Sequence, residues 1–507
     1  MKKKWSAVSL FFTSIGLLLI PNITATTGME NIDNPTTLAS LTSTNPGTLS
    51  GYVTDSAMNP IEGAKVRVSF HDTYRENYSD TTGYYHITDI PICNCTKNTT
   101  CFKQGYQLVC VYLSIWEDTT YDFVLPSKGN WWYVGGSGPG NYSRIQDAID
   151  NATDSDTVYV YPGLYKEHIE INQSIRLQGA DPSTTIIDGE NLDNDLITCV
   201  GTEVFIGGFT IRNCSTIHSG VLINHTTNCA LYRTTISTAG YGITMRNAQN
   251  ISIVKNMLLQ TLNNTTGNIA IRIDNCRYST VSQNNISSWE GGIFLHGTHL
   301  LITQNTISNT HRGITDTFNS LPLLTKYVTI DNNHLNQNKI AIAFLGSTDF
   351  SITRNEITNS TGIGINVKED TYTSVRLQNV SIKDNIISNS AQGIVSENSL
   401  NMSIEGNHIQ HNTLGLSFLY DSFTSVKKNT FQDNNRTVVY QWAFFPIAPF
   451  KSKVPQFDLN FWDHSQKVPY PILGRWGISE PYFLFRPINI FPWVTFDWHP
   501  APEPIEG

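Results

Sequence analysis

Short hydrophobic runs recur along most of the chain, and an asparagine stands at a fixed place in each of them. The repeated unit reads Ile-x-x-Asn-x-Ile with conservative replacements, and its asparagine returns at intervals of 21 to 30 residues. These asparagines are Asn256, Asn284, Asn305, Asn333, Asn355, Asn385, Asn407 and Asn429. Such a period, with short apolar segments and no helical pattern in each unit, predicts a solenoid of stacked β-coils.

The repeated asparagines have a predicted structural role. In stacked coils the same residue of each coil lies at the same bend, and neighbouring coils are about 4.8 Å apart. Side-chain amides at that spacing form a ladder, which satisfies backbone groups that a turn leaves without partners. Leucine-rich repeats have a similar period, but their Leu-x-x-Leu-x-Leu pattern is missing. We therefore predict an all-β protein built on a right-handed parallel β-helix over residues 143–436.

Both ends of the solenoid have predicted covers. Residues 145–152 place apolar side chains on one helical face, and Ser143 with Gln146 forms a candidate capping box. This short helix is expected to close the first coil. The aromatic and proline-rich stretch 437–507 is expected to close the last coil, because an uncovered coil exposes unpaired strand edges.

A different pattern precedes the solenoid. Over residues 47–126, short strands of alternating polarity are separated by Gly, Asn and Pro turns, which predicts a small β-sandwich. The signatures Gly-x-Val-x-Asp at 51–55 and Gly-Ala-x-Val at 63–66 resemble the carboxypeptidase regulatory-like, or transthyretin-like, domain. The resemblance implies a spacer or accessory module without carboxypeptidase activity. A glycine-rich linker at 127–142 is predicted to join this module to the solenoid.

The first residues predict export. Three lysines precede the apolar stretch 7–20, which a proline ends. This is the plan of a signal peptide over residues 1–25, and the stretch is shorter than the about 20 residues of a membrane span. An uncleaved anchor is the alternative. Residues 26–46 are predicted to be a flexible linker, and no later run approaches spanning length, so we expect an extracellular or cell-surface location.

Cysteine usage agrees with an oxidising compartment. The chain has eight cysteines, and four of them within eighteen residues are candidate disulfide partners: Cys93, Cys95, Cys101 and Cys110. Their pairing does not follow from the sequence. Their spacing fits a zinc site poorly, so neither a metal nor another cofactor is predicted.

Composition narrows the class of partner. Charged residues make up 15% of the 507 residues, and the formal net charge is −9. Nucleic acid is excluded as an expected partner, because no basic cluster follows the first four residues. Hydrophobic residues at 39% are enough for a large folded core. Nothing in the sequence indicates the oligomeric state.

The solenoid resembles a known group, the pectin-lyase-like right-handed β-helix proteins, and within it the copper-accessory, NosD-like repeat family. The resemblance rests on segments at the two ends of the solenoid: 145–149, 156–165, 171–179, 185–189, 460–462 and 496–500. It implies the fold but says little about activity, because function depends on the site.

The resemblance also directs a search for enzymatic motifs. Polygalacturonases of this superfold use clustered aspartates and a Gly-His-Gly element, pectate lyases an acidic calcium site, and alginate epimerases an Asp-Pro-His-Asp element. None of these is found in the sequence, and no two aspartates are adjacent, although glycoside hydrolysis needs paired carboxylates. Only six methionines and no run of His or Met argue against a copper role. We predict no catalytic residue.

One polar column is the candidate ligand site. Counting four positions after each motif glycine, with Asn268 in place of one glycine, gives a column on four consecutive coils: Asn224, Arg246, Arg272 and His296. Strand alternation directs these side chains outward. Stacked arginines are unfavourable unless an anion or a carboxylate separates them, so we expect a shallow groove for acidic sugars. The alternative is a solvated face on which the arginines are offset or paired with local aspartates.

The sequence favours a secreted or cell-surface β-helix protein that binds polysaccharide or cell-envelope glycans without catalysis. Two alternatives stay open. One is a polysaccharide lyase or glycoside hydrolase that uses the same polar column, and the other is a NosD-like copper accessory protein, which only the family resemblance favours.

Overall fold

The structure is a computed structural model. It describes residues 46–504, with gaps at 57, 71–72, 93–95, 117, 192, 238–239, 261–266, 317–324, 369–376, 420, 422–423, 445–455, 463–469, 479–487 and 502. The predicted signal peptide and nearly all of the linker after it lie outside the described residues. The chain divides into two compact units, Met1–Gly129 and Asn130–Gly507. Among the described residues, no helix is long and apolar enough to cross a membrane.

The first unit is a small β-sandwich of two four-stranded sheets. One sheet contains β1 (Gly47–Asp55), β4 (Tyr84–Ile90), β7 (Asp118–Thr120) and β8 (Phe123–Leu125). The other contains β2 (Lys65–Phe70), β3 (Thr73–Tyr78), β5 (Thr96–Phe102) and β6 (Val109–Ser114). Alternate residues of β1 and β2, such as Leu49, Val53, Val66 and Val68, are fully buried between the sheets. The strand alternation of the sequence therefore produces a two-layer unit with its own core.

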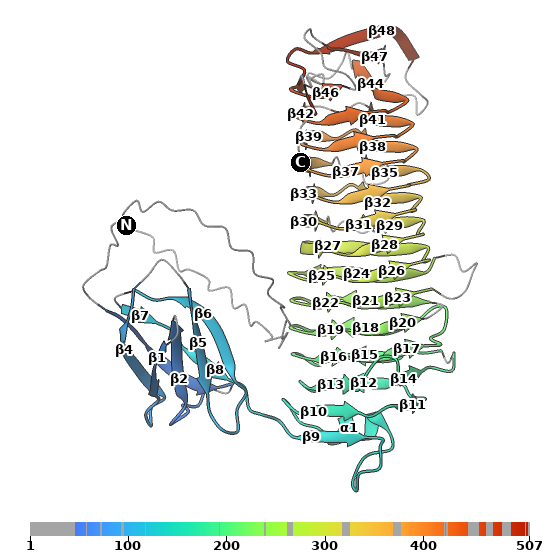
Figure 1. Ribbon diagram of the computed structural model, residues 1–507. Helices are drawn as coiled ribbons and strands as arrows, with labels where there is room; N and C mark the ends of the chain where they lie inside the picture. Colours follow the sequence, from blue (N-terminus) through green and yellow to red (C-terminus); the bar gives the residue numbers. More distant parts are fainter. Residues whose placement is uncertain are drawn as a thin grey trace, which may run out of the picture. The chain divides into compact units, whose positions relative to one another are not determined.

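The second unit is the predicted right-handed parallel β-helix, whose coils Figure 1 shows stacked from β9 to β48. From β10 to β47 each coil contributes one strand to each of three sheets, which we call sheets I, II and III in chain order. All three sheets are parallel except at the last strand, β48.

The strands of sheet I are β9 (Trp131–Val134), β10 (Thr157–Val160), β13 (Arg176–Gly179), β16 (Phe205–Gly207), β19 (Ala230–Tyr232), β22 (Ser252–Val254), β25 (Thr280–Ser282), the end of β27 (Gly291–Thr303), β30 (Lys326–Asp331), β33 (Thr348–Thr353), β36 (Gln378–Lys383), β39 (Leu400–Glu405), β42 (Ser425–Lys427) and β45 (Gln456–Asp458). Sheet II is 13-stranded. Its strands are β11 (Gly163–Tyr165), β14 (Thr185–Asp188), β17 (Thr210–Arg212), β20 (Thr235–Ser237), β23 (Met257–Leu259), β26 (Asn285–Ser287), β28 (Thr306–Ser308), β31 (His334–Asn336), β34 (Glu356–Thr358), β37 (Ile386–Ser388), β40 (His408–Gln410), β43 (Thr430–Gln432) and β46 (Phe461–Trp462).

The strands of sheet III are β12 (Ile169–Ile171), β15 (Ile197–Cys199), β18 (Ser219–Asn224), β21 (Tyr241–Arg246), β24 (Ile269–Arg277), the start of β27, β29 (Arg312–Asp316), β32 (Ile340–Leu345), β35 (Ile363–Lys368), β38 (Gln392–Glu397), β41 (Leu414–Leu419), β44 (Arg436–Phe444), β47 (Tyr470–Ile478) and β48 (Ile488–Asp497). β27 turns the corner from sheet III to sheet I without a break, since its start pairs with β24 and β29 and its end with β25 and β30.

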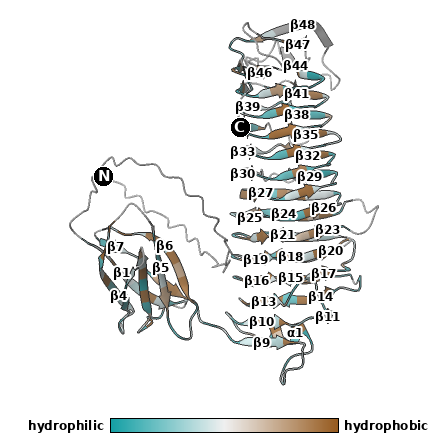
Figure 2. Cartoon of the chain, in the orientation of Figure 1, coloured by the Kyte–Doolittle hydropathy of each residue, from teal (hydrophilic) through white to brown (hydrophobic). Residues whose placement is uncertain are grey.

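Aliphatic side chains stacked from coil to coil form the core, and Figure 2 shows hydrophobic positions recurring along the strands. One column of sheet III is fully buried over eight coils: Ile243, Ile271, Ile293, Ile314, Ile342, Ile365, Ile394 and Leu416. Each such side chain contributes about 1.5–3 kcal/mol through its removal from water. The repeated Ile and Val of the sequence thus set the coil register.

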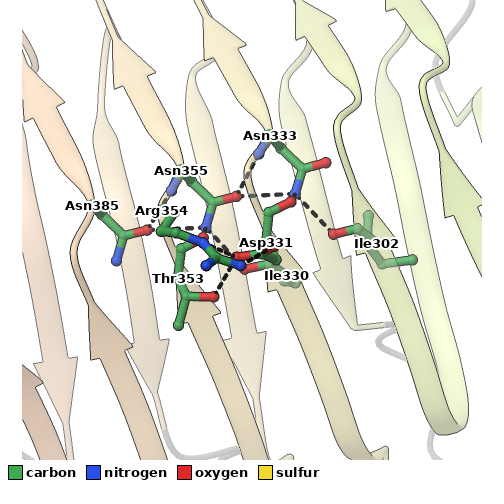
Figure 3. A network of polar contacts seen from close by, with 8 residues as sticks. All are labelled: Ile302, Ile330, Asp331, Asn333, Thr353, Arg354, Asn355 and Asn385. Carbon is green, nitrogen blue, oxygen red and sulfur yellow. Dashed lines mark hydrogen bonds and ion pairs between the residues drawn. The ribbon is translucent and has the colours of Figure 1, made fainter. Parts of the chain in front are cut away.

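The repeated asparagines lie at the bend between sheets I and II, and their amides are joined from coil to coil (Figure 3). Asn355 is representative: its Nδ2 donates to Asn385 Oδ1 at 3.0 Å, and its Oδ1 accepts from the backbone N–H of Asn333 at 2.9 Å. The same Nδ2 also donates to the Ile330 carbonyl of the preceding coil at 3.0 Å. The series continues beyond Asn429 to Asn460, whose amide donates to Asp497.

The helix α1 (Ile145–Asn151) packs against the first coil, with Ile145, Ala148 and Ile149 buried, as the sequence predicts. The predicted capping box is wrong, because the N-cap residue is Arg144 and not Ser143, and the N-cap makes no side-chain hydrogen bond to the helix. Instead, the Glu167 carboxylate accepts from the backbone N–H groups of the first two helical residues at 2.8 and 3.1 Å. A carboxylate from the next coil therefore replaces the local cap.

Regular coils extend further at both ends than the sequence predicts. β9, within the predicted linker 127–142, pairs in parallel with β10 and forms the first strand of sheet I. β44, which starts at residue 436, and β47 still pair in parallel with the strands before them. β48 reverses the direction and pairs antiparallel with β47.

Candidate functional site

The strand register places three of the four residues of the predicted column together and moves the fourth. Asn224 pairs with Arg246, Arg246 with Asp274, and Asp274 with His296. Arg272 lies two residues earlier in β24, opposite Thr244. The prediction of Arg246 and Arg272 in one column is therefore wrong, because Ala270 and not Asn268 takes the place of the motif glycine.

The close stacking of the coils is visible at Gly242. A Cβ atom added there would lie 2.4 Å from the Ala270 carbonyl oxygen of the next coil, so this coil requires glycine. At the equivalent position of the next coil, the methyl group of Ala270 is accommodated and fully buried.

An aspartate neutralises much of the charge of the two arginines. Arg272 Nε donates to Asp274 Oδ2 at 2.8 Å, and Arg246 Nε lies 3.8 Å from the same oxygen. The Arg272 guanidinium also lies 5.4 Å from the ring centre of Tyr241. This arrangement matches the alternative in which the two arginines are offset and paired with a local aspartate. It is not a stacked pair of arginines that needs an anion between them. Beside it, the Asn224 Oδ1 atom is buried without a hydrogen-bond partner among the described residues.

The corner where sheet III turns into sheet I carries a second exterior column that the sequence analysis missed. Its eight residues lie in consecutive coils with φ between 53° and 60°: Asn228, Asn250, Tyr278, His299, Tyr327, Asp349, Asn379 and Asn401. Asn, Asp and His tolerate this left-handed backbone, whereas a bulky tyrosine is rarely found there. The two tyrosines therefore stand at positions where the left-handed backbone disfavours a bulky side chain.

The rings of this column form a stack. The Tyr278 and His299 ring centres are 4.7 Å apart, and the His299 and Tyr327 ring centres are 4.8 Å apart. Both tyrosines are 54% exposed. On the C-terminal side, Asn379 Nδ2 donates to Asp349 Oδ1 at 2.7 Å and so continues the column as a polar ladder. The result is an exposed aromatic ridge with amide and carboxylate groups at its ends.

A shallow hollow lies on each side of this aromatic stack. The N-terminal hollow is lined by His225, Thr226, Thr227, Asn247, Ala248, Gln249, Asn275 and Arg277. The C-terminal hollow is lined by Tyr327, Val328, Thr329, Asp349, Phe350, Ser351 and Asn379. We call the two hollows and the aromatic stack between them the corner groove.

Polar side chains of the N-terminal hollow are held by one another. Asn275 Nδ2 donates to Asn247 Oδ1 at 2.7 Å, and Asn247 Nδ2 donates to His225 Nε2 at 3.1 Å. Arg277 is exposed and has no ion-pair partner among the described residues. The hollow thus combines fixed amides, an imidazole and an unneutralised guanidinium, which suit a ligand rich in hydroxyl and acidic groups.

A sequence signal for the aromatic stack exists. Tyr278, His299 and Tyr327 each lie six positions before a ladder asparagine, namely Asn284, Asn305 and Asn333. Counting backward from the ladder, and not forward from the glycine, would have aligned them.

The disulfide candidates belong to the first unit. Cys101 is a buried thiol and Cys110 an exposed thiol. Because Cys101 pairs with Val109 and Thr100 with Cys110, the two cysteines point to opposite faces of their sheet and do not bond to each other. Cys93 and Cys95 lie outside the described residues.

Comparison with known families assigns the second unit to a family. The family described as periplasmic copper-binding protein (NosD) matches residues 149–372 and 268–443, which together cover more than half of the chain. The chain belongs to this family.

Other similarities to this NosD-family protein are partial. A stretch of 100 residues is 31% identical to a cell surface glycoprotein of Methanothermus fervidus, and it covers 19% of this chain and 16% of that protein. Among solved structures, the A-module of mannuronan C-5 epimerase AlgE4 of Azotobacter vinelandii has 16% identity and a TM-score of 0.44, over 60% of this chain and 97% of the module. PfbA, a surface adhesin of Streptococcus pneumoniae, has 13% identity and a TM-score of 0.46, over 71% and 95% of the two chains.

The NosD family description names copper. Copper sites favour clustered soft donors. The described part of the chain contains no group of three or more His, Cys, Asp or Glu side chains that could hold one ion. Met245 and Met402 are buried in the core. These residues do not fit a copper centre, and we assign no step to copper.

Proposed function

We propose that this NosD-family protein binds acidic glycans along the corner groove, without catalysis. The observation that carries the proposal is the exposed Tyr278–His299–Tyr327 stack beside a hollow whose Arg277 has no ion-pair partner within the described part of the chain. Exposed aromatic rings offer apolar surface to the faces of sugar rings. The amides of the hollow offer hydrogen bonds to hydroxyl groups, and Arg277 offers a charge-assisted bond to a carboxylate or sulfate.

The direction of the groove supports a linear ligand. The aromatic column runs from coil to coil, so that a chain lying along it meets successive rings and amides at a regular spacing. The Arg246–Asp274–Arg272 cluster lies in neighbouring columns of sheet III. Its two guanidinium groups and one carboxylate leave a surplus of one positive charge. This surplus adds to the attraction of Arg277 for an anionic chain.

We further propose a cell-surface location for the exported protein. The similarity to a short part of a cell surface glycoprotein supports it, as do the predicted signal peptide and the periplasmic description of the family. We propose the first unit as a carboxypeptidase regulatory-like spacer, supported by its sandwich of two four-stranded sheets and its sequence signatures.

The test is retention of the exported protein on a panel of immobilised acidic and neutral polysaccharides, with released sugars measured in the same samples. Retention on acidic members without released products supports the proposal. Released products would instead support the lyase or hydrolase alternative. Equal retention on neutral and acidic members would contradict the selectivity that Arg277 is proposed to supply.

A further inference from the structure

Two buried cysteines face each other beneath the N-terminal hollow of the corner groove. Cys199 ends β15, and Cys229 immediately precedes β19 in the next coil. Their Sγ atoms are 4.0 Å apart, and the residues are 0% and 2% exposed. No sequence spacing singled out this pair, because 30 residues separate its members. Their proximity follows from the coil stacking.

The surroundings of the pair suit a neutral cross-link. The polar neighbours of Cys229 Sγ are the Gly201 and Thr227 carbonyls, each at 3.4 Å, and the Thr226 hydroxyl at 3.5 Å. Cys199 Sγ lies 3.8 Å from the Gly201 carbonyl, and both cysteines belong to the buried core. A disulfide carries no charge and has no S–H group that needs a partner there. Bond formation brings its sulfurs from 4.0 Å to about 2.05 Å apart.

We propose that Cys199 and Cys229 are oxidised to a disulfide in the exported protein, and that this bond fixes the coil beneath the N-terminal hollow. Thr226 connects the two features, because it lines the hollow and its hydroxyl donates to the same Gly201 carbonyl that contacts Cys229. The proposal is independent of glycan binding.

The oxidant belongs to the class of small or protein disulfides found in oxidising compartments. The Cys229 thiolate attacks one sulfur of that disulfide, breaks its S–S bond and releases one thiolate. The Cys199 thiolate then attacks the Cys229 sulfur of the mixed disulfide, forms the Cys199–Cys229 bond and releases the second thiolate. The two protons lost by the cysteines end on the two released thiolates, so the external disulfide is reduced and the cysteine pair is oxidised.

The two thiols are not equivalent in the closed coil. The hydrogen bond from the Cys199 thiol lowers the pKa of Cys229, against the effect of its burial. The same bond, together with burial, raises the pKa of Cys199. Since both sulfurs are buried, the exchange has to occur before the coils close over the pair or while this coil is open.

The test maps the sulfur chemistry of the exported full-length chain. The protein is denatured without reductant, alkylated, digested and analysed by mass spectrometry. We expect a cross-linked peptide pair containing Cys199 and Cys229, lighter by two hydrogen atoms than the sum of the free peptides. Cys214 and Cys276 serve as internal controls, because both are buried thiols that contact backbone carbonyls and should be alkylated. Full alkylation of Cys199 and Cys229 would overturn the proposal.

A stability measurement separates a cross-link from a mere contact. A reductant should lower the melting temperature of the wild type by several degrees more than that of the C199S/C229S variant, which keeps only the candidate disulfide partners of the first unit. Cys276→Ser is the matched control, a buried thiol two coils beyond Cys229 that should keep the full response to reductant. An equal response in the wild type and the C199S/C229S variant would contradict a bond between these two residues. The mapping of the unaltered chain decides the question even where a variant does not fold.

Discussion

Asn355 and Asn385 are 30 residues apart in the chain, and the side-chain amide of the first donates to the side-chain oxygen of the second at 3.0 Å. Both residues are at most 1% exposed. Their contact repeats the one that Asn333 makes with Asn355 at 3.0 Å. The buried ladder therefore joins neighbouring coils by directional hydrogen bonds, which the aliphatic core cannot supply.

Replacing Asn355 with alanine should lower the free energy of unfolding by about 2–4 kcal/mol, because it leaves buried backbone groups without partners. These are the Ile330 carbonyl and the N–H of Asn333, both bonded to the Asn355 side chain. Chemical denaturation measures the loss. The matched control is Asn285→Ala, an exposed asparagine in a strand of sheet II, which should cost under about 0.5 kcal/mol. Equal losses in the two variants would show that the ladder adds nothing to stability.

The buried Asp421 should make the protein less stable as pH rises. Burial raises the pKa of Asp421 to about 7, against hydrogen bonds from Ser399 and Ser396. Between the unfolded pKa near 4 and the folded value, the folded chain keeps a proton that the unfolded chain has lost, so stability falls as pH rises. The loss is on the order of 4 kcal/mol by pH 7. Asp421→Asn should remove this slope in denaturation curves recorded from pH 4 to pH 8.

Asp331 is the control of opposite sign. The hydrogen bond from Arg354 lowers the pKa of Asp331, and Figure 3 shows this pair beside the ladder. Its stabilisation is present above the unfolded pKa and is lost as pH falls through the folded value. Asp331→Asn should therefore lose stability at neutral pH but not in acid. Identical pH profiles for the two variants would refute these opposite assignments.

Arg277→Gln should weaken binding of an acidic polysaccharide about tenfold, as expected for the loss of one charge-assisted hydrogen bond. The remaining affinity should depend less on salt, because screening acts on the charge that the variant lacks. Affinity measured at low and high ionic strength checks both points. Arg354→Gln, an exposed arginine paired with Asp331 outside the groove, is the matched control and should bind like the wild type. A weakening of the same size in the control would indicate nonspecific attraction by the surface.

His299→Asn should interrupt the aromatic stack and leave the fold intact. Asparagine accepts the left-handed backbone of residue 299, where φ is 56°, so the change removes a ring without adding strain. We expect the affinities for acidic and for neutral polysaccharide segments to fall alike, because the ring contributes contact area and no specificity for charge. Affinity chromatography measures both. Trp498→Ala removes a 64% exposed ring outside the groove and should have no effect.

The repeat spacing was enough to predict the solenoid, since each ladder asparagine has only one place in a coil. It did not align the exterior columns, because the coils differ in length and Ala270 replaces a motif glycine. Tyr278 and Tyr327 were invisible to strand alternation, since both have the left-handed backbone of the corner, which interrupts the alternation. The pairing of Asp274 with two arginines depends on that register as well. The periodicity of the sequence was enough to predict the core, whereas the positions of the surface side chains depend on the coil register.

The most direct test of the glycan proposal is titration calorimetry of one acidic oligosaccharide against the wild type and the R277Q/H299N variant. The control is R354Q/W498A, which removes the same kinds of side chain, a cation and an exposed aromatic ring, outside the corner groove. The account predicts a loss of affinity of tenfold or more in the groove variant, with the control unchanged. Wild-type affinity in the groove variant would contradict a binding site along this corner.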